Sequence, residues 1–242
     1  MHRLVLDLPP VMTLNSAFLD LQGVILNRLQ AGTTIKAVIL TSNIKVLSAG
    51  MGLKEALGFD LKDQQAMVRS LNVNFTKLFG FPKPTIVAAS GAAIAGGFFL
   101  VLASDYRIAS LKARFGLAEV RVGANFPVGP LAIARATLAP NDLRRLMLGG
   151  HPIGAEAALA AGIVDIIEDG DAVMARVQSG RHSLTSQRPA RRWPLVRSLC
   201  SLPRRMPHGA SATAAEVPSP PAPAREAEDM PLIHISEPKK PY

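Results

Sequence analysis

The residues best suited to chemistry lie in three short segments, residues 47–54, 90–99 and 113–119. The first two are turns rich in Gly, Ala and Ser, whose small side chains can leave a backbone N–H open to a ligand. The third places one carboxylate, Glu119, after an expected strand. Two N–H donors facing one oxygen, with a base nearby, are what proton abstraction next to a carbonyl requires.

Each segment taken alone also has a purely structural interpretation. A small-residue turn is often only a tight connection, and a glutamate after a strand often pairs with a cation. Arg121 lies two residues beyond Glu119. If a strand continued here, alternation would place both side chains on one face, and pairing would lower the basicity of the carboxylate. Neither glycine-rich segment has the spacing of a nucleotide-phosphate loop.

The elements that must position these segments alternate in an α/β rhythm up to about residue 178. Continuous apolar runs at residues 37–41 and 85–89 predict strands buried on both faces. The remaining expected strands span residues 4–8 and 106–109, and the expected helices span residues 18–29, 67–79, 97–103, 143–148 and 155–161. Gly162 is well placed to end the last of these helices.

Composition excludes several classes of protein. The 242 residues are 48% hydrophobic, yet no apolar run approaches the ~20 residues of a membrane span. A single cysteine, Cys200, excludes an internal disulfide and favours the cytoplasm. The five histidines lack metal-ligand spacing, and no Gly-x-Ser-x-Gly elbow is present. We therefore expect no metal site and no serine nucleophile.

The net charge of +9 is unevenly distributed. Residues 1–178 carry 17 basic and 13 acidic residues, whereas residues 179–242 carry 10 and 5, together with 11 of the 19 prolines. This change predicts a folded domain over residues 1–178 and an irregular Arg/Pro-rich tail over residues 179–242, disordered or non-native. The Arg-rich residues 181–205 leave RNA binding as an alternative, but only Trp193 and Tyr242 could stack on bases.

The order of these motifs resembles the crotonase family, the enoyl-CoA hydratase/isomerase superfamily. The resemblance covers roughly residues 4–175. It rests on residues 14–18, 37–41, the Ser-Ala-Gly turn at 48–50, and residues 83–89, 104–109, 115–119 and 156–165. It implies a crotonase-like α/β fold, a spiral of repeated ββα units, assembled as a trimer or a dimer of trimers. In this pattern Asp105 and Arg107 belong to the structural part.

The resemblance also implies roles for individual residues. The oxyanion-hole N–H groups map to Met51 and Gly96, and Glu119 maps to a catalytic acid–base residue. The other positions expected around the substrate are Ala49, Gly50, Gly52, Leu53, Ala95, Gly97, Phe99 and Ala118. The substrate is an acyl-CoA thioester, so CoA belongs to the substrate and no separate cofactor is expected.

Two positions depart from the family pattern. Family hydratases hold water between two glutamates, and the first of these falls at Phe99, which cannot hold a proton. Gly52 stands where many members have Asp. A single glutamate can still carry a proton from C2 to C4, as in 3,2-enoyl-CoA isomerases. We therefore expect isomerase rather than hydratase chemistry, with a non-catalytic acyl-CoA binder or a truncated inactive copy as the alternative.

Overall fold

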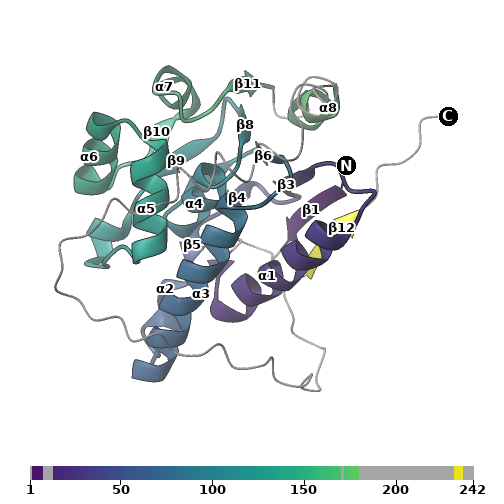
Figure 1. Ribbon diagram of the computed structural model, residues 1–242. Coiled ribbons are helices and arrows are strands. Elements are labelled where there is room, and N and C mark those ends of the chain that lie inside the picture. The colour runs from purple at the N-terminus through teal and green to yellow at the C-terminus, as the bar shows by residue number, and fades with distance from the viewer. Residues whose placement is uncertain (1, 8–12, 170–171, 180–231, 237–242) are drawn as a thin grey trace.

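The structure is a computed structural model that describes residues 2–7, 13–169, 172–179 and 232–236 (Figure 1). The strands are β1 (His2–Asp7), β2 (Thr13–Leu14), β3 (Val38–Ser42), β4 (Val46–Ser48), β5 (Gly50–Met51), β6 (Thr85–Ala89), β7 (Ala92–Ile94), β8 (Tyr106–Ser110), β9 (Arg114–Gly116), β10 (Ile153–Gly154), β11 (Ile166–Glu168) and β12 (Leu232–Ser236). The helices are α1 (Ser16–Ala31), α2 (Leu53–Ala56), α3 (Leu61–Phe79), α4 (Gly96–Leu102), the 3₁₀ helix η1 (Glu119–Val122), α5 (Val128–Thr137), α6 (Pro140–Gly149), α7 (Ala155–Ala160) and α8 (Ala172–Ser179).

The chain repeats a strand–strand–helix unit, as the family resemblance implied. β3, β6 and β8 pair in parallel within a six-stranded sheet of order β11-β8-β6-β3-β1-β12. Each is followed by a strand of a second sheet, of order β10-β9-β7-β4, in which β4, β7 and β9 are parallel. Helices then follow: α2 and α3 after the first unit, α4 after the second, and η1, α5 and α6 after the third. This is a crotonase-like α/β fold.

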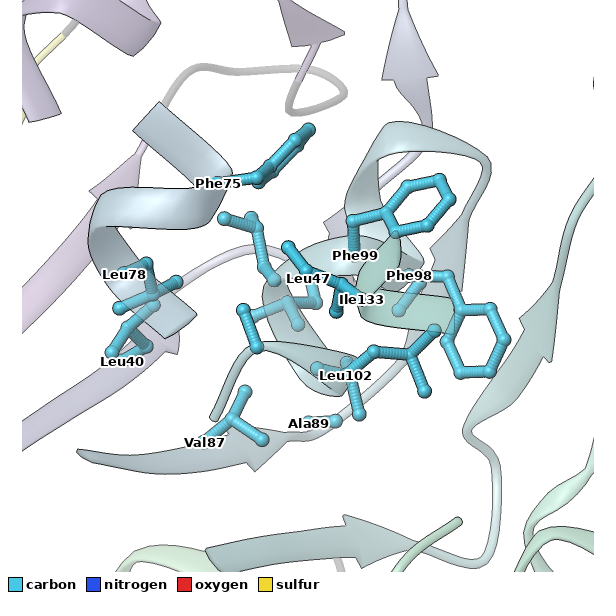
Figure 2. Close-up of a cluster of buried hydrophobic side chains, with 14 of the residues drawn as sticks. Leu40, Leu47, Phe75, Leu78, Val87, Ala89, Phe98, Phe99, Leu102 and Ile133 are labelled. Atoms are coloured by element: carbon cyan, nitrogen blue, oxygen red, sulfur yellow. The ribbon is translucent and has the colours of Figure 1, made fainter. Parts of the chain in front are cut away.

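The central strands β3 and β6 of the six-stranded sheet are buried along their whole length, which explains their continuous apolar runs. Val87 and Ala89 of β6 belong to the main core and point toward Leu102 of α4 (Figure 2). Ile86 and Ala88, at the alternate positions, belong to a second cluster that includes Val173 and Val177 of α8. Because successive side chains of a strand point to opposite faces, each face needs its own apolar partner.

Side-chain caps fix the ends of the two long helices. Asn15 accepts a hydrogen bond from the Phe18 N–H at 2.9 Å and caps α1. Asp60 and Asp63 form a reciprocal capping box at the start of α3. These bonds satisfy N–H groups that have no partner inside the helix. Gly162 has a φ of +66° directly after α7, so the expected helix stop is confirmed.

Asp105 and Arg107 tie the end of α4 to the six-stranded sheet, which supports their structural role. The Asp105 carboxylate accepts from the N–H and the hydroxyl of Thr85, at 2.8 and 2.7 Å. The Arg107 guanidinium donates to the carbonyls of Ser104, Ile163 and Leu102 at 3.1–3.2 Å. One ionised side chain therefore collects carbonyls from segments that are distant in sequence.

The tail differs in part from expectation. Leu232–Ser236 forms β12, which pairs antiparallel with β1, so the prediction of irregular structure is wrong for these five residues. Backbone pairing with a sheet edge needs little from the side chains, and composition does not reveal it. The Arg-rich residues 181–205 lie outside the described residues, and the domain boundary at residue 178 stays a prediction.

Replacing Asp105 with Ala should lower the free energy of unfolding by about 2–4 kcal/mol, because it leaves the buried Thr85 N–H without its charged acceptor. Urea denaturation followed by circular dichroism measures the change. Asp142→Ala is the matched control, since this carboxylate has only a 4.0 Å surface contact with Arg145. The control should lose less than about 1 kcal/mol. Equal losses in the two variants would contradict the anchoring role of Asp105.

Candidate active site

One cavity of about 420 Å³ gathers the three segments singled out in the sequence. A cavity of this size with a largely apolar wall is typical of a small-molecule site. Its wall comes from β5 and α2, from α3, from the β7–α4 junction, and from η1 to the start of α5. The lining residues are Ala49, Met51, Leu53, Ala56, Phe59, Gln64, Met67, Val68, Leu71, Phe75, Ile94, Ala95, Gly96, Phe99, Ala118, Glu119, Val122, Ala124, Asn125, Pro127 and Pro130.

The parallel strands of the four-stranded sheet explain why these segments meet. β4, β7 and β9 are neighbours and run in the same direction. Their carboxyl ends therefore lie at one edge of the sheet. The residues that follow these ends are 49–51, 95–96 and 117–119. Segments separated by dozens of residues in sequence are thus brought to one place by strand order alone.

Eight of the eleven residues proposed from the sequence line the cavity. They are Ala49, Met51, Leu53, Ala95, Gly96, Phe99, Ala118 and Glu119. The three remaining positions, Gly50, Gly52 and Gly97, do not line it. Gly52 is the N-cap residue of α2, without a side-chain bond. Gly50 and Gly97 serve the close packing of the backbone around the site.

Gly50 and Gly97 allow two turns to approach within backbone contact. Gly50 has a φ of +83°, and a Cβ there would lie 2.9 Å from the Ala95 Cβ and 3.1 Å from the Gly96 nitrogen. A Cβ on Gly97 would lie 2.4 Å from the carbonyl oxygen of Ser48. Any larger residue must displace one turn from the other. The absence of side chains here therefore brings residues 50–51 next to the first N–H of α4.

Ala95 holds the Gly96 N–H in a strained but well-anchored turn. It is the one non-glycine residue with positive φ among the described residues, with φ +50° and ψ −123°. These angles match the first central position of a type II′ turn, which favours glycine. The Ala95 N–H donates to the Gly116 carbonyl at 2.8 Å, and its own carbonyl accepts from the Phe98 N–H at 2.9 Å. Both bonds compensate for the strain, which often marks functional sites.

Met51 approaches the same point from β5. It lies opposite Leu14 in the short parallel pair of β2 and β5. Gly96 is the first residue of α4, where a backbone N–H has no partner within the helix. The two residues proposed as oxyanion donors thus lie on adjacent turns at the cavity wall.

Glu119 is the only ionisable residue among those lining the cavity. Its Oε2 atom is buried without a hydrogen-bond partner within the described part of the chain. Burial raises the pKa of Glu119 from its usual 4.5 to about 7, and the residue's own N–H opposes this only in part. An isolated carboxyl group in an apolar cavity favours its neutral form. A base with a pKa near neutrality is well matched to proton transfer.

The pairing of Arg121 with Glu119, which the sequence left open, is not found in the described structure. Residues 119–122 form a 3₁₀ helix, not a strand, so side chains two apart project about 120° from each other. No ion pair joins these two residues in the described structure, and no neighbouring charge shifts the pKa of Glu119. Gly123, with a φ of +66°, ends the turn. The local backbone therefore separates the cation from the carboxylate.

Phe99 contributes an aromatic ring to the same cavity that Glu119 lines. Its side chain is 2% exposed and lies 5.7 Å from the ring of Phe75 and 6.4 Å from that of Phe126. Figure 2 shows Phe75 of α3 and Phe99 of α4 at the same border of the buried cluster. Such aromatic packing keeps water from the cavity wall. Nothing at this position can accept a proton.

The sequence did not identify the wall that α3 contributes. Met67, Leu71 and Phe75 recur at helical spacing and mark one face of the expected helix at residues 67–79, and this face lines the cavity. A helical face predicts burial but not whether the buried face meets protein or ligand. Within the described residues there is no cluster of three potential metal ligands. None of the described helices has the length and apolar character needed to cross a membrane.

Comparison with known proteins gives the family. Residues 3–196 match the enoyl-CoA hydratase/isomerase family, and the chain belongs to it. Its members process acyl-CoA thioesters, which fits the apolar cavity and its adjacent N–H donors.

Solved structures agree with this assignment. The fold is similar to an enoyl-CoA hydratase from Shewanella pealeana, with 25% identity and a TM-score of 0.72 over 82% of this chain and 76% of that one. It is also similar to an enoyl-CoA hydratase/isomerase family protein from Silicibacter pomeroyi, with 25% identity and a TM-score of 0.75 over 83% and 88%. An enoyl-CoA isomerase from Mycobacterium tuberculosis shares the fold, at 23% identity and a TM-score of 0.73 over 82% and 86%.

Replacing Gly50 with Ala should lower the free energy of unfolding by about 2–4 kcal/mol, because it adds left-handed strain and a clash with Ala95 and the Gly96 nitrogen. Thermal and urea denaturation measure this loss. Gly58→Ala is the control, since its Cβ would meet no atom closer than 3.5 Å and its φ is ordinary. A Gly50→Ala protein as stable as the control would mean that the two turns are not tightly packed.

Proposed function

We propose that this protein is an enoyl-CoA isomerase that moves a double bond from 3-enoyl-CoA to trans-2-enoyl-CoA, with Glu119 as the proton shuttle. The observation that carries this proposal is the solitary carboxyl group: Glu119 is the single ionisable side chain lining a largely apolar cavity. Hydration of a double bond in this family needs a second glutamate to position water. In the family pattern this second glutamate falls at residue 99, which is Phe in this chain.

The proposed reaction is a proton transfer along the acyl chain. The Glu119 carboxylate takes the C2 proton of the 3-enoyl thioester. The C2–H electrons form the C1=C2 double bond of a dienolate, and the π electrons of the thioester carbonyl move to its oxygen. Negative charge then develops on the thioester oxygen, to which the N–H groups of Met51 and Gly96 donate. The same proton returns to C4, where the C3=C4 electrons bind it. The C1=C2 electrons then form the C2=C3 double bond, the thioester carbonyl is restored, and the carboxylate is regenerated. The reaction is balanced without an added redox agent or metal.

The environment of Glu119 supports this role. Burial holds the pKa of its carboxyl group at about 7, so the carboxylate is a stronger base than an exposed glutamate. The protonated form remains accessible for return of the proton to C4. General-base catalysis of this type contributes about 10²–10⁴ in rate, and an oxyanion donor about 10²–10³. CoA arrives as part of the substrate, so we propose no resident cofactor.

The subcellular location and the assembly are also proposals, which we base on the family. We propose a cytoplasmic enzyme that assembles as a homotrimer or hexamer, as the family pattern implies. Exposed apolar side chains fit burial in such an assembly: Leu57, directly after α2, is 89% exposed, and Leu61 of α3 and Val128 of α5 are 70% and 75% exposed. Analytical ultracentrifugation measures the assembly directly.

Glu119→Gln should lower isomerase kcat/KM by about 10²–10⁴, because an amide cannot accept the C2 proton. A coupled spectrophotometric assay with a series of 3-enoyl-CoA chain lengths measures the loss, and calorimetry should show that acyl-CoA binding is retained. Glu156→Gln is the matched control, because Glu156 is an exposed residue of α7 away from the cavity. Its activity should equal that of the wild type.

The same preparation should not hydrate trans-2-enoyl-CoA at a rate comparable with isomerisation. Efficient hydration would contradict the single-glutamate mechanism. A folded protein that binds acyl-CoA and turns over neither substrate would instead be a non-catalytic acyl-CoA binder. Equal activity of Glu119→Gln and wild type would exclude Glu119 as the base.

The isomerase rate should depend on pH with an inflection near 7. Because the base acts as a carboxylate and its pKa is raised to about 7, log kcat/KM should rise with slope 1 below this pH and level off above it. Initial rates between pH 5.5 and 8.5 measure the profile. Residual activity of Glu119→Gln should lack this inflection. An inflection between pH 4 and 5 would show that the carboxyl group is solvated or paired with a cation.

A further inference from the structure

The C-terminal end of α6 packs directly on the turn that carries Glu119. Gly150 follows α6 with a φ of +63°, and its N–H donates to the Leu146 carbonyl at 3.1 Å. A Cβ at this position would lie 2.7 Å from Val120 Cγ1, and 2.8 and 3.2 Å from Cγ and Cδ of Arg121. These atoms belong to the stems of the two residues that follow Glu119. The stem of Arg121 thus occupies the space that a side chain at position 150 would need, and only glycine has no Cβ there.

This contact fixes the direction of Arg121. Its side chain runs along the end of α6, while Glu119, two residues earlier in the same 3₁₀ turn, faces the cavity. With about three residues per turn, holding one side chain in place fixes the rotation of the whole turn. A displaced turn could bring the guanidinium and the carboxylate together, since they are only two residues apart.

We propose that Gly150 is a positioning residue for Glu119: it lets η1 pack on the end of α6 and thereby keeps Arg121 away from the catalytic carboxylate. This role rests on the proposed function, in which Glu119 is the catalytic base. Gly150 lies 31 residues beyond Glu119 in sequence and does not line the cavity.

Of the charged residues around this turn, Arg121 is the cation that could reach Glu119. On η1 the charged residues are Glu119 and Arg121, and on α6 they are Asp142, Arg144 and Arg145, with His151 after Gly150. None of these groups shifts the pKa of Glu119, which burial dominates. An arginine brought within about 4–6 Å of a carboxylate lowers its pKa by about 1–3 units. Loss of the contact should therefore be visible as a lower pKa of Glu119.

The experiment measures the pKa of Glu119 without turnover, by carbonyl-detected NMR of protein labelled with ¹³C at the glutamate carboxyl carbon. The resonance that is missing in Glu119→Gln identifies the group. In Gly150→Ala its midpoint should fall by at least about 1 pH unit from the wild-type value. The double variant with Arg121→Met should return toward the wild-type midpoint. Isomerase kcat/KM in Gly150→Ala should show the same shift of its inflection.

Two glycines provide matched controls. Gly149→Ala adds a Cβ one residue earlier, where nothing lies within 4 Å and φ is ordinary. Gly162→Ala adds the same left-handed strain as Gly150→Ala, at a φ of +66°, also with nothing within 4 Å. Gly162→Ala should therefore lose stability, yet keep the wild-type midpoint of Glu119. Gly149→Ala should change neither quantity.

Several results would overturn the proposal. An unchanged midpoint in folded Gly150→Ala would do so, as would a rise of 1 pH unit or more in Arg121→Met alone, which would mean that Arg121 already pairs with Glu119. If Gly150→Ala does not fold, Gly150→Asn tests the same clash, because Asn tolerates positive φ better. The measurement on Arg121→Met alone tests the proposal even if neither Gly150 variant folds. The expected midpoints in a protein without isomerase activity would refute the proposed reaction and leave the positioning role intact.

Discussion

The site is organised around one buried carboxyl group, whose surroundings favour its neutral form. Glu119 stands alone in an apolar cavity, and desolvation raises its pKa to about 7. This state persists only while no cation reaches the carboxylate and while aromatic rings such as Phe99 keep the wall dry. The 3₁₀ geometry of η1 and the glycine at the end of α6 meet the first condition. The packing of α3 against α4 meets the second.

A second constraint is the close approach of backbone segments from different repeats. The parallel order of β4, β7 and β9 delivers three connections to one edge of the sheet. Gly50 and Gly97 then let two of these connections touch, and the strained turn at Ala95 sets the direction of the next N–H. Preorganised donors of this kind need no rearrangement when charge develops on a substrate oxygen. The fold therefore places the backbone of Met51 and Gly96 and the side chain of Glu119 at one cavity.

Membership of the enoyl-CoA hydratase/isomerase family and the composition of this cavity constrain the chemistry in different ways. The family establishes an enzyme that processes acyl-CoA thioesters. The cavity supplies one acid where hydration needs two, which is why we favour a shift of the double bond. The structural relatives include proteins described as hydratases and as an isomerase, so fold alone does not separate these reactions.

The sequence by itself determined the alternating elements, the buried parallel strands and the three segments that meet at the cavity. These features follow from local patterns: apolar runs, helical spacing and small-residue turns. It did not determine the direction of Arg121, because the stem of this side chain packs against Gly150, far along the chain. Nor did it show that Met67 and Phe75 line a cavity, since a helical pattern marks a buried face but not its partner. Only the tertiary structure decided these points, because they depend on contacts between segments that no local pattern records.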